Sequence, residues 1–152
     1  MSRAVQHLPS PRVRERLPRG RLAAQYYDES GSAPDGVAIY ALADPRDARA
    51  VRYVGQSADP RRRLAQHVRA ARLELPDERP WWVSSPRLRP LYEWIRELYA
   101  DGARLPVMVV RAWVAPAQAR GAERGHICEC LRRGLPLLNF ESELLARQLL
   151  LL

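Results

Sequence analysis

A glutamate on an apolar helix face is the first residue whose position suggests chemistry. Four residues follow one another at four-residue spacing and so share one face of a predicted helix: Ala119, Glu123, Ile127 and Leu131. The carboxylate of Glu123 therefore interrupts an apolar stripe. An unpaired charge is costly in such a place, and a metal ion or an arginine would resolve the conflict. Taken alone, the pattern also fits a solvated glutamate or a structural ion pair.

Arg63 and His67 form a second candidate pair, because residues four apart share one face of a helix. An arginine there can bind a phosphate oxygen and stabilise charge that develops around phosphorus. Spacing alone does not favour Arg63 over its neighbours Arg61 and Arg62, and a lone histidine is more often a packed or exposed residue. All three arginines are predicted to contact nucleic acid.

Two tyrosines and an asparagine complete the set of candidate residues. Tyr40 and Tyr53 fall in two predicted strands, where a tyrosine is usually buried for packing. Asn139 follows the helix that carries Glu123, and after Pro136 it also fits an ordinary turn residue.

The order of these residues resembles that of the GIY-YIG nuclease family. The matching elements are, in order, Ala38-Ile39-Tyr40, Tyr53-Val54-Gly55, Arg63 with His67, Glu123 and Asn139. Arg63 follows Tyr53 by ten residues and His67 comes four residues later, which is the spacing of the family. The resemblance covers roughly residues 36–140. Ala38 is a departure, since the family usually has glycine there, but an extended strand should tolerate the added methyl group.

The resemblance implies a metal-dependent endonuclease that hydrolyses phosphodiester bonds in DNA. It assigns catalytic roles to Tyr40, Tyr53, Arg63, His67, Glu123 and Asn139. Glu123 would hold one Mg²⁺ or Mn²⁺, and Tyr40, assisted by His67, would deprotonate or orient the attacking water. Arg63 would stabilise the phosphorus, and the remaining two residues would position the phosphate or the site. The alternative is a nucleic-acid-binding module of the same fold that does not cut.

The charge of the chain favours nucleic acid as a partner. The formal net charge is +8, and a basic surface attracts polyanions. All 25 basic residues are arginine, so every phosphate contact by a side-chain cation must use a guanidinium group. No small-molecule cofactor is expected.

Cysteine usage and hydropathy predict a cytoplasmic protein without a membrane partner. Cys128 and Cys130 stand two residues apart with no second pair, so neither a disulfide framework nor a four-ligand zinc site is available. No apolar stretch approaches the ~20 residues of a membrane-spanning helix. The apolar run at residues 149–152 either packs on the chain's own core or forms a contact with a second copy or a partner. The second possibility leads to a third hypothesis, beside the nuclease and the binding module, that the protein is an interaction domain.

The predicted elements describe an α/β fold: a small GIY-YIG-type domain with a three-stranded, mainly antiparallel sheet flanked by helices. The strands are expected at residues 37–42, 51–55 and 107–113, and the helices from Pro60 onward and at 88–100, 116–133 and 141–152. The domain spans residues 36–140. Residues 1–35, rich in arginine and proline, read as a basic arm, and residues 141–152 as a C-terminal helix that packs on the domain or on a partner.

A proline-rich segment between the first two predicted helices carries two tryptophans. Trp81 and Trp82 lie in residues 73–87, which read as a loop. Base stacking is one role for such aromatics, but packing in the core or anchoring of the loop is favoured about two to one.

Overall fold

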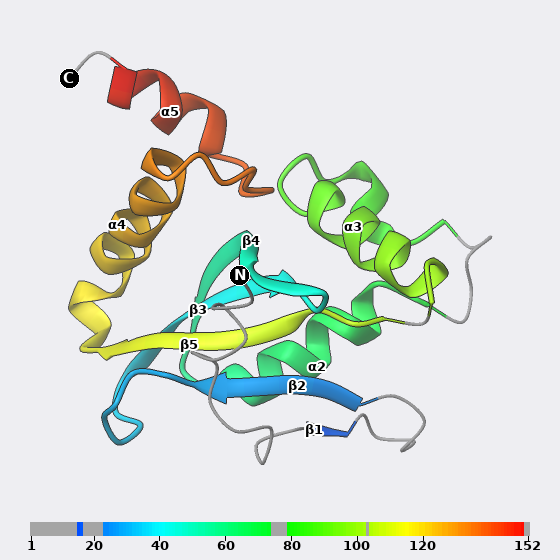
Figure 1. The fold of residues 1–152 in the computed structure, drawn as a ribbon, viewed down its shortest axis with the longest axis horizontal. Helices are drawn as coiled ribbons and strands as arrows, with labels where there is room; N and C mark the ends of the chain where they lie inside the picture. Colours follow the sequence, from blue (N-terminus) through cyan, green and yellow to red (C-terminus); the bar gives the residue numbers. More distant parts are fainter. Residues whose placement is uncertain (1–14, 17–22, 74–78, 103, 151–152) are drawn as a thin grey trace.

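The computed structural model of the chain describes residues 15–16, 23–73, 79–102 and 104–150 (Figure 1). The strands are β1 (Glu15–Arg16), β2 (Ala23–Asp28), β3 (Val37–Asp44), β4 (Asp47–Ser57) and β5 (Val107–Val114). The helices are α2 (Pro60–Ala70), α3 (Arg89–Ala100), α4 (Ala119–Arg132) and α5 (Ser142–Leu150), with 3₁₀ turns at Trp81–Ser84 and Pro116–Gln118. Within this part of the chain, no helix has the length and apolar character that a membrane crossing needs.

The sheet confirms the α/β class and corrects the predicted number of strands. The strand order is β1-β2-β5-β3-β4, with β1 only two residues long. The predicted antiparallel part is present, because β3 lies between β4 and β5 and runs antiparallel to both. The prediction of three strands is wrong, since β2 pairs with β5 in parallel and makes the sheet mixed.

Strand β2 falls inside residues 1–35, which the sequence predicted to be an arm. Ala24, Tyr26 and Tyr27 are all buried, so this segment belongs to the folded domain. Its sequence, AAQYYD, has two strand-favouring tyrosines, but its alanines and aspartate are disfavoured in strands and it has no β-branched residue, so its strand signal is mixed. Pairing with the edge of β5 decides its conformation. The rest of the predicted arm, apart from Glu15–Arg16 and the loop after β2, lies outside the described residues.

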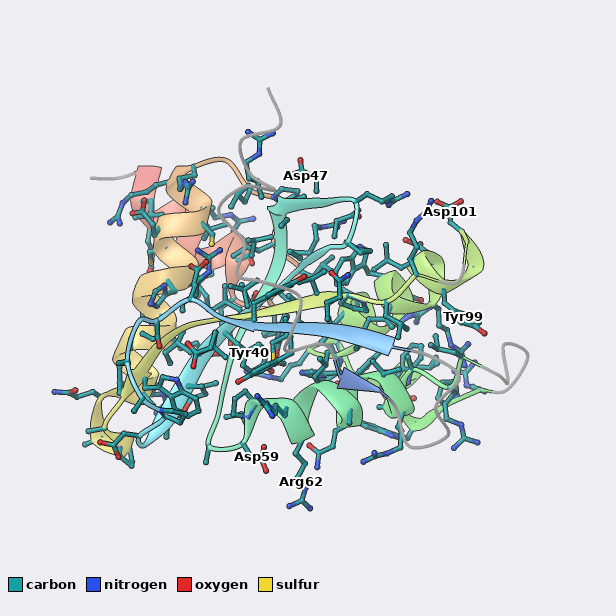
Figure 2. All side chains as sticks on the ribbon, turned by 60° about the horizontal axis from the view of Figure 1, so that its bottom comes forward. Tyr40, Asp47, Asp59, Arg62, Tyr99 and Asp101 are labelled. Carbon is teal, nitrogen blue, oxygen red and sulfur yellow. The ribbon has the colours of Figure 1, made fainter. Side chains whose placement is uncertain are left out.

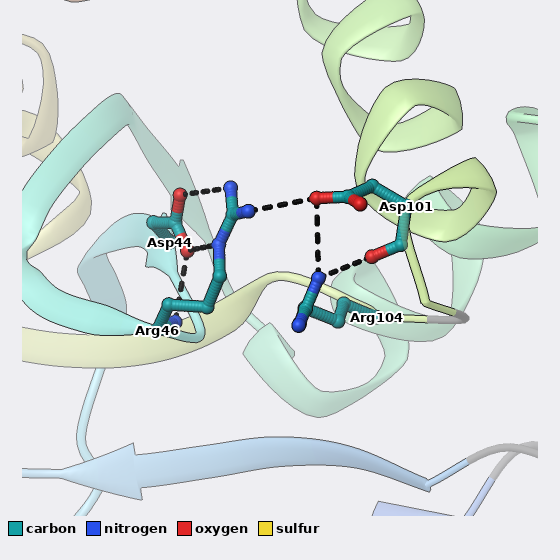
Figure 3. A network of polar contacts seen from close by, with 4 residues as sticks. All are labelled: Asp44, Arg46, Asp101 and Arg104. Atoms are coloured by element: carbon teal, nitrogen blue, oxygen red, sulfur yellow. Dashed lines mark hydrogen bonds and ion pairs between the residues drawn. The ribbon is translucent and has the colours of Figure 1, made fainter.

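The hairpin between β3 and β4 is tight, because the two strands extend to Asp44 and from Asp47, beyond the expected residues 37–42 and 51–55. Arg46 stabilises it, with its guanidinium 2.8 Å from Asp44 and 2.9 Å from Asp101 at the end of α3. Arg104 also pairs with Asp101, so four side chains tie the hairpin to the end of that helix (Figure 3). These pairs are exposed, so salt screens them.

Helices cover both faces of the sheet. Alternate residues of β3 point to opposite faces, so the strand contributes to a core on each side. Tyr40 and Leu42 belong to the core formed with α2 and α3. Ile39 and Ala41 belong to the core formed with α4 and α5. Figure 1 shows α4 and α5 together at one side of the sheet and α3 at the other.

The helix that follows β4 begins as its sequence predicts. The Asp59 carboxylate accepts a hydrogen bond from the backbone N–H of Arg62 at 3.2 Å, and Pro60 occupies the first turn. Gly102, with φ of +97°, stands just beyond α3, where the sequence predicted the helix to stop. In Figure 2, Asp59 and Arg62 project from the outer side of α2, whereas Tyr40 lies inside.

The predicted C-terminal helix is present and packs on the domain. Leu145 of α5 is buried in the same core as Ile127 and Cys130 of α4. Leu144, the preceding residue of α5, is 59% exposed. Residues 151–152, part of the terminal apolar run, lie outside the described residues.

The two motif glycine positions of the resemblance behave differently. Ala38 is fully buried in β3, and among the described residues only Arg72 is a non-glycine with positive φ, so the strand tolerates alanine as expected. Gly55 lies directly opposite Tyr40 across the β3–β4 pair. A Cβ added to Gly55 would lie 2.6 Å from both Cζ and the hydroxyl oxygen of Tyr40, so the tyrosine ring occupies the space of a side chain.

We predict that Gly55→Ala destabilises the protein by about 1–3 kcal/mol, because the Tyr40 ring is buried and has no room to move. Urea unfolding of the full chain measures this. Gly121→Ala is the matched control, since a Cβ at this exposed helical position meets nothing within 4 Å. The control should gain about 1 kcal/mol from helix propensity, and a Gly55→Ala variant as stable as the wild type would contradict the packing described.

Candidate active site

A buried hydrogen bond between Tyr40 and His67 forms the centre of the candidate site. The Tyr40 hydroxyl, from β3, lies 2.8 Å from Nε2 of His67, on α2. Both side chains are 1% exposed. Tyr53 of β4 lies on the same face, with its ring centroid 6.0 Å from that of His67. The predicted pairing of Tyr40 with His67 is therefore present in the fold.

His67 also contacts a residue that the sequence did not single out. The hydroxyl of Tyr92, on α3, lies 3.1 Å from Nδ1 of His67. Tyr92 falls in the helix predicted at residues 88–100, and its side chain is buried there. A tyrosine buried there needs a partner for its hydroxyl group, and that requirement was the available signal.

The histidine is held in its neutral form. Burial, and then the charge of Arg63, lower the pKa of His67 from 6.5 to about 3. Burial also raises the pKa of the Tyr40 phenol above its usual 10.0; Tyr53 adds to this shift and Arg63 opposes it. Both partners are neutral at pH 7, so proton transfer between them alone would create two unfavourable buried charges.

Arg63 faces this pair from the first turns of α2 and has an unused donor. Its guanidinium is close enough to Tyr40 to lower the pKa of that phenol by charge and hydrogen bonding. Its Nη1 donates to the Gln66 side chain at a long 3.4 Å. Its Nε is buried and has no hydrogen-bond partner among the described residues. A buried donor of this kind is expensive unless something accepts from it, and an anion would do so.

An open depression of about 430 Å³ adjoins Arg63 where β4 passes into α2. Its lining residues are Gln56, Ser57, Ala58, Asp59, Arg62, Arg63 and Gln66. Two of the three predicted nucleic-acid-binding arginines therefore border it. Arg61 instead lies over the ring of Tyr26, 5.0 Å from its centroid, which gives it a contact with β2.

Glu123 lies on the other side of the edge strand β4. As predicted, it shares a helix face with Ala119 and Ile127, both buried. Its Oε1 accepts a 2.6 Å hydrogen bond from Nε2 of Gln56, one of the residues that line the depression. Gln56 is the second site residue that the sequence did not indicate.

The charge of Glu123 reaches Tyr53 on the opposite face of the sheet. Burial, and then this charge, raise the pKa of Tyr53 to about 12. Arg63 opposes that shift, which places the cation and the anion within electrostatic range of the same phenol.

The donor set fits a divalent cation bound largely by water and substrate. In the part of the chain that the structure describes, no group of three or more His, Cys, Asp or Glu side chains could hold a metal ion. Mg²⁺ is often bound by one or two carboxylates together with phosphate oxygens and waters. A carboxylate has about four lone-pair positions, so Glu123 keeps coordinating capacity beside its hydrogen bond to Gln56.

Asn139 supports the site from the edge of the sheet. Its Oδ1 accepts from the backbone N–H of Val54 at 2.9 Å, and its Nδ2 donates to the Val54 carbonyl at 2.8 Å. The side chain thus pairs with β4 as another strand would. Leu138 extends this pairing through its N–H to the carbonyl of Arg52. Asn139 fixes the strand segment between Tyr53 and Gly55 and faces the backbone.

The two tryptophans separate into different roles. Trp82 is buried, and its Nε1 donates to the carbonyl of Ala70 at the end of α2, which confirms the packing interpretation for this residue. Trp81 is 66% exposed.

We predict that Asn139→Ala lowers the free energy of unfolding by about 2–4 kcal/mol, because it leaves the buried N–H and carbonyl of Val54 without partners. Chemical denaturation measures the loss. Ser142→Ala is the nearby control, since the buried Ser142 hydroxyl has no hydrogen-bond partner among the described residues. A loss in Asn139→Ala no larger than in the control would contradict the pairing.

We predict a stability loss at acidic pH that depends on His67. Between pH 6.5 and about 3 the unfolded chain protonates this histidine and the folded chain does not, so stability falls as pH falls through this range. At pH 4.5 the effect is about 3 kcal/mol. Urea unfolding of wild type and His67→Gln at pH 7 and pH 4.5 isolates it, because all other groups are shared. Equal pH dependence in the two proteins would show that His67 is not held neutral.

Comparisons of the chain with protein-family models, with curated proteins and with solved structures found no match. The resemblance to GIY-YIG nucleases therefore depends on the motif residues and their spacing.

Proposed function

We propose that this protein is a divalent-metal-dependent endonuclease that hydrolyses phosphodiester bonds in DNA. The observation that carries the proposal is the buried, unpartnered Nε of Arg63, beside the Tyr40–His67 pair and next to an open depression. Glu123, joined to that depression by Gln56, adds a carboxylate that suits a hard cation. The net charge of +8 favours a polyanionic substrate.

Arg63 binds and orients the scissile phosphate in this proposal. A guanidinium donates through several N–H groups in a fixed plane, which matches two oxygens of a phosphate. Arg62, exposed on the rim of the depression, holds a neighbouring phosphate of the same strand. Mg²⁺ or Mn²⁺ at Glu123 would supply Lewis-acid stabilisation of the phosphate oxygens and lower the pKa of the attacking water.

Proton transfer runs through the tyrosine and the histidine. Tyr40 accepts a proton from the water as its own proton passes to Nε2 of His67, so a buried phenolate never forms. The acceptor is a weak base in the free protein, partly because Arg63 lies close by. A bound phosphodiester carries a negative charge that offsets Arg63, which raises the pKa of His67 when substrate is present. The base therefore gains strength on binding.

We predict that Arg63→Ala and Glu123→Gln each lower the cleavage rate at least about a hundredfold, because each removes a charge that stabilises the transition state. The assay follows nicking of a supercoiled plasmid and cleavage of duplex, branched and single-stranded oligonucleotides with Mg²⁺ or Mn²⁺. Thermal unfolding of every variant confirms that it is folded.

The controls carry the same changes at exposed positions on the same helices. Arg69→Ala and Glu129→Gln should cleave within a few-fold of wild type. Equal activity in wild type, Arg63→Ala and Glu123→Gln would reject this site. Salt-sensitive DNA binding without cleavage under either metal would instead favour the module that binds and does not cut.

A further inference from the structure

Both ring nitrogens of His67 are engaged by tyrosine hydroxyls from different elements. Nε2 contacts Tyr40 on β3 at 2.8 Å, and Nδ1 contacts Tyr92 on α3 at 3.1 Å. The imidazole thus bridges the sheet and the second of the helices packed on it. Arg63, on the same helix as His67, and Tyr53, on β4, also lie near the ring.

A neutral imidazole couples the two hydrogen bonds, because it carries one N–H. If Nδ1 bears the hydrogen, it donates to Tyr92, and Nε2 accepts from Tyr40. If Nε2 bears it, both directions reverse, and Tyr92 donates to Nδ1. The second arrangement leaves Nε2 unable to accept a proton from Tyr40. The tautomer therefore decides whether the histidine can serve the neighbouring tyrosine.

The observed distances favour the first arrangement. Hydroxyl donors make the shorter hydrogen bonds in proteins, and N–H donors the longer ones. The 2.8 Å contact fits the Tyr40 hydroxyl as donor to Nε2, and the 3.1 Å contact fits Nδ1–H as donor to Tyr92.

Packing fixes the Tyr92 hydroxyl at Nδ1. Tyr92 is buried, and its ring lies 5.4 Å from that of Trp82 with a tilt of 38°. The Trp82 indole N–H in turn donates to the Ala70 carbonyl. The Arg96 guanidinium lies over the Trp82 ring, with its Cζ 5.1 Å from the ring centroid. The tryptophan thereby holds Tyr92 against α2, and the segment predicted as a loop becomes part of the support of the site.

We propose that Tyr92 is a positioning residue that holds His67 in the Nδ1–H tautomer and so keeps Nε2 as the proton acceptor for Tyr40. The catalytic consequence rests on the proposed nuclease function. The tautomer itself does not, because it is a property of the folded chain without substrate.

The test reads the tautomer directly by NMR of the nitrogen-labelled full chain at pH 7, through two-bond correlations between the ring carbon-bound protons and the ring nitrogens. His67→Gln identifies the His67 signals by their disappearance. The wild type should show mainly Nδ1–H. In Tyr92→Phe the Nδ1–H loses its acceptor, and the ratio of Nδ1–H to Nε2–H should fall on the order of tenfold.

Tyr99→Phe is the matched control, because Tyr99 is a partly buried tyrosine of the same helix that Figure 2 shows well away from Tyr40. It should leave the His67 tautomer ratio unchanged. A wild type dominated by Nε2–H overturns the proposal whether or not Tyr92→Phe folds. A ratio that does not change in a folded Tyr92→Phe variant overturns it as well.

Cleavage kinetics separate this inference from the proposed function. Tyr92→Phe should lower kcat about tenfold and leave KM within a few-fold, because Arg63 and the depression are untouched. If the tautomer shifts as expected but the wild type cleaves no substrate, the nuclease proposal fails and the positioning role stands. If the tautomer shifts and kcat does not, the histidine is not the proton acceptor and the catalytic part of the inference is rejected.

Discussion

The hydrogen bond between His67 and Tyr40 joins α2 to β3 inside the core, and much of the candidate site depends on it. A histidine is tolerated in the core only if its ring nitrogens are hydrogen-bonded and the ring remains neutral. Burial keeps the ring neutral, and two tyrosines provide the partners. Because the histidine is fixed at its position on α2, Arg63 one turn earlier is held beside Tyr40.

The edge strand β4 explains how residues from both faces of the sheet form one site. Tyr53 and Gly55 point to the face of α2 and α3, whereas Gln56 points to the face of α4. If β4 were a central strand, neighbouring strands on both sides would keep side chains of the two faces apart. The segment that ends in Asn139 pairs with β4 without covering the depression, so the outer edge is satisfied and the end of the strand stays open.

Residues whose role is local were predictable from sequence, and residues whose role depends on pairing were not. The helix cap at Asp59 and the buried face of Glu123 follow from short-range patterns, and the structure has both. Arg63 could be distinguished from Arg61 and Arg62 only by its place in the family motif, because helix spacing alone does not favour one of the three. Strand β2 was missed because its partner β5 lies about eighty residues away in sequence, and Tyr92 because a helix face does not reveal which polar group it meets.

Arg63 and Glu123 affect the buried groups between them in opposite directions. Arg63 lowers the pKa of His67, which weakens the proposed proton acceptor, and Glu123 raises the pKa of Tyr53. A phosphodiester offsets Arg63, and a cation offsets Glu123. Only when both are bound would both charge contributions be offset, while the larger contribution of burial to each pKa stays. In the proposed reaction, the two charges that perturb these buried groups would thus also attract the phosphodiester and the cation that offset them.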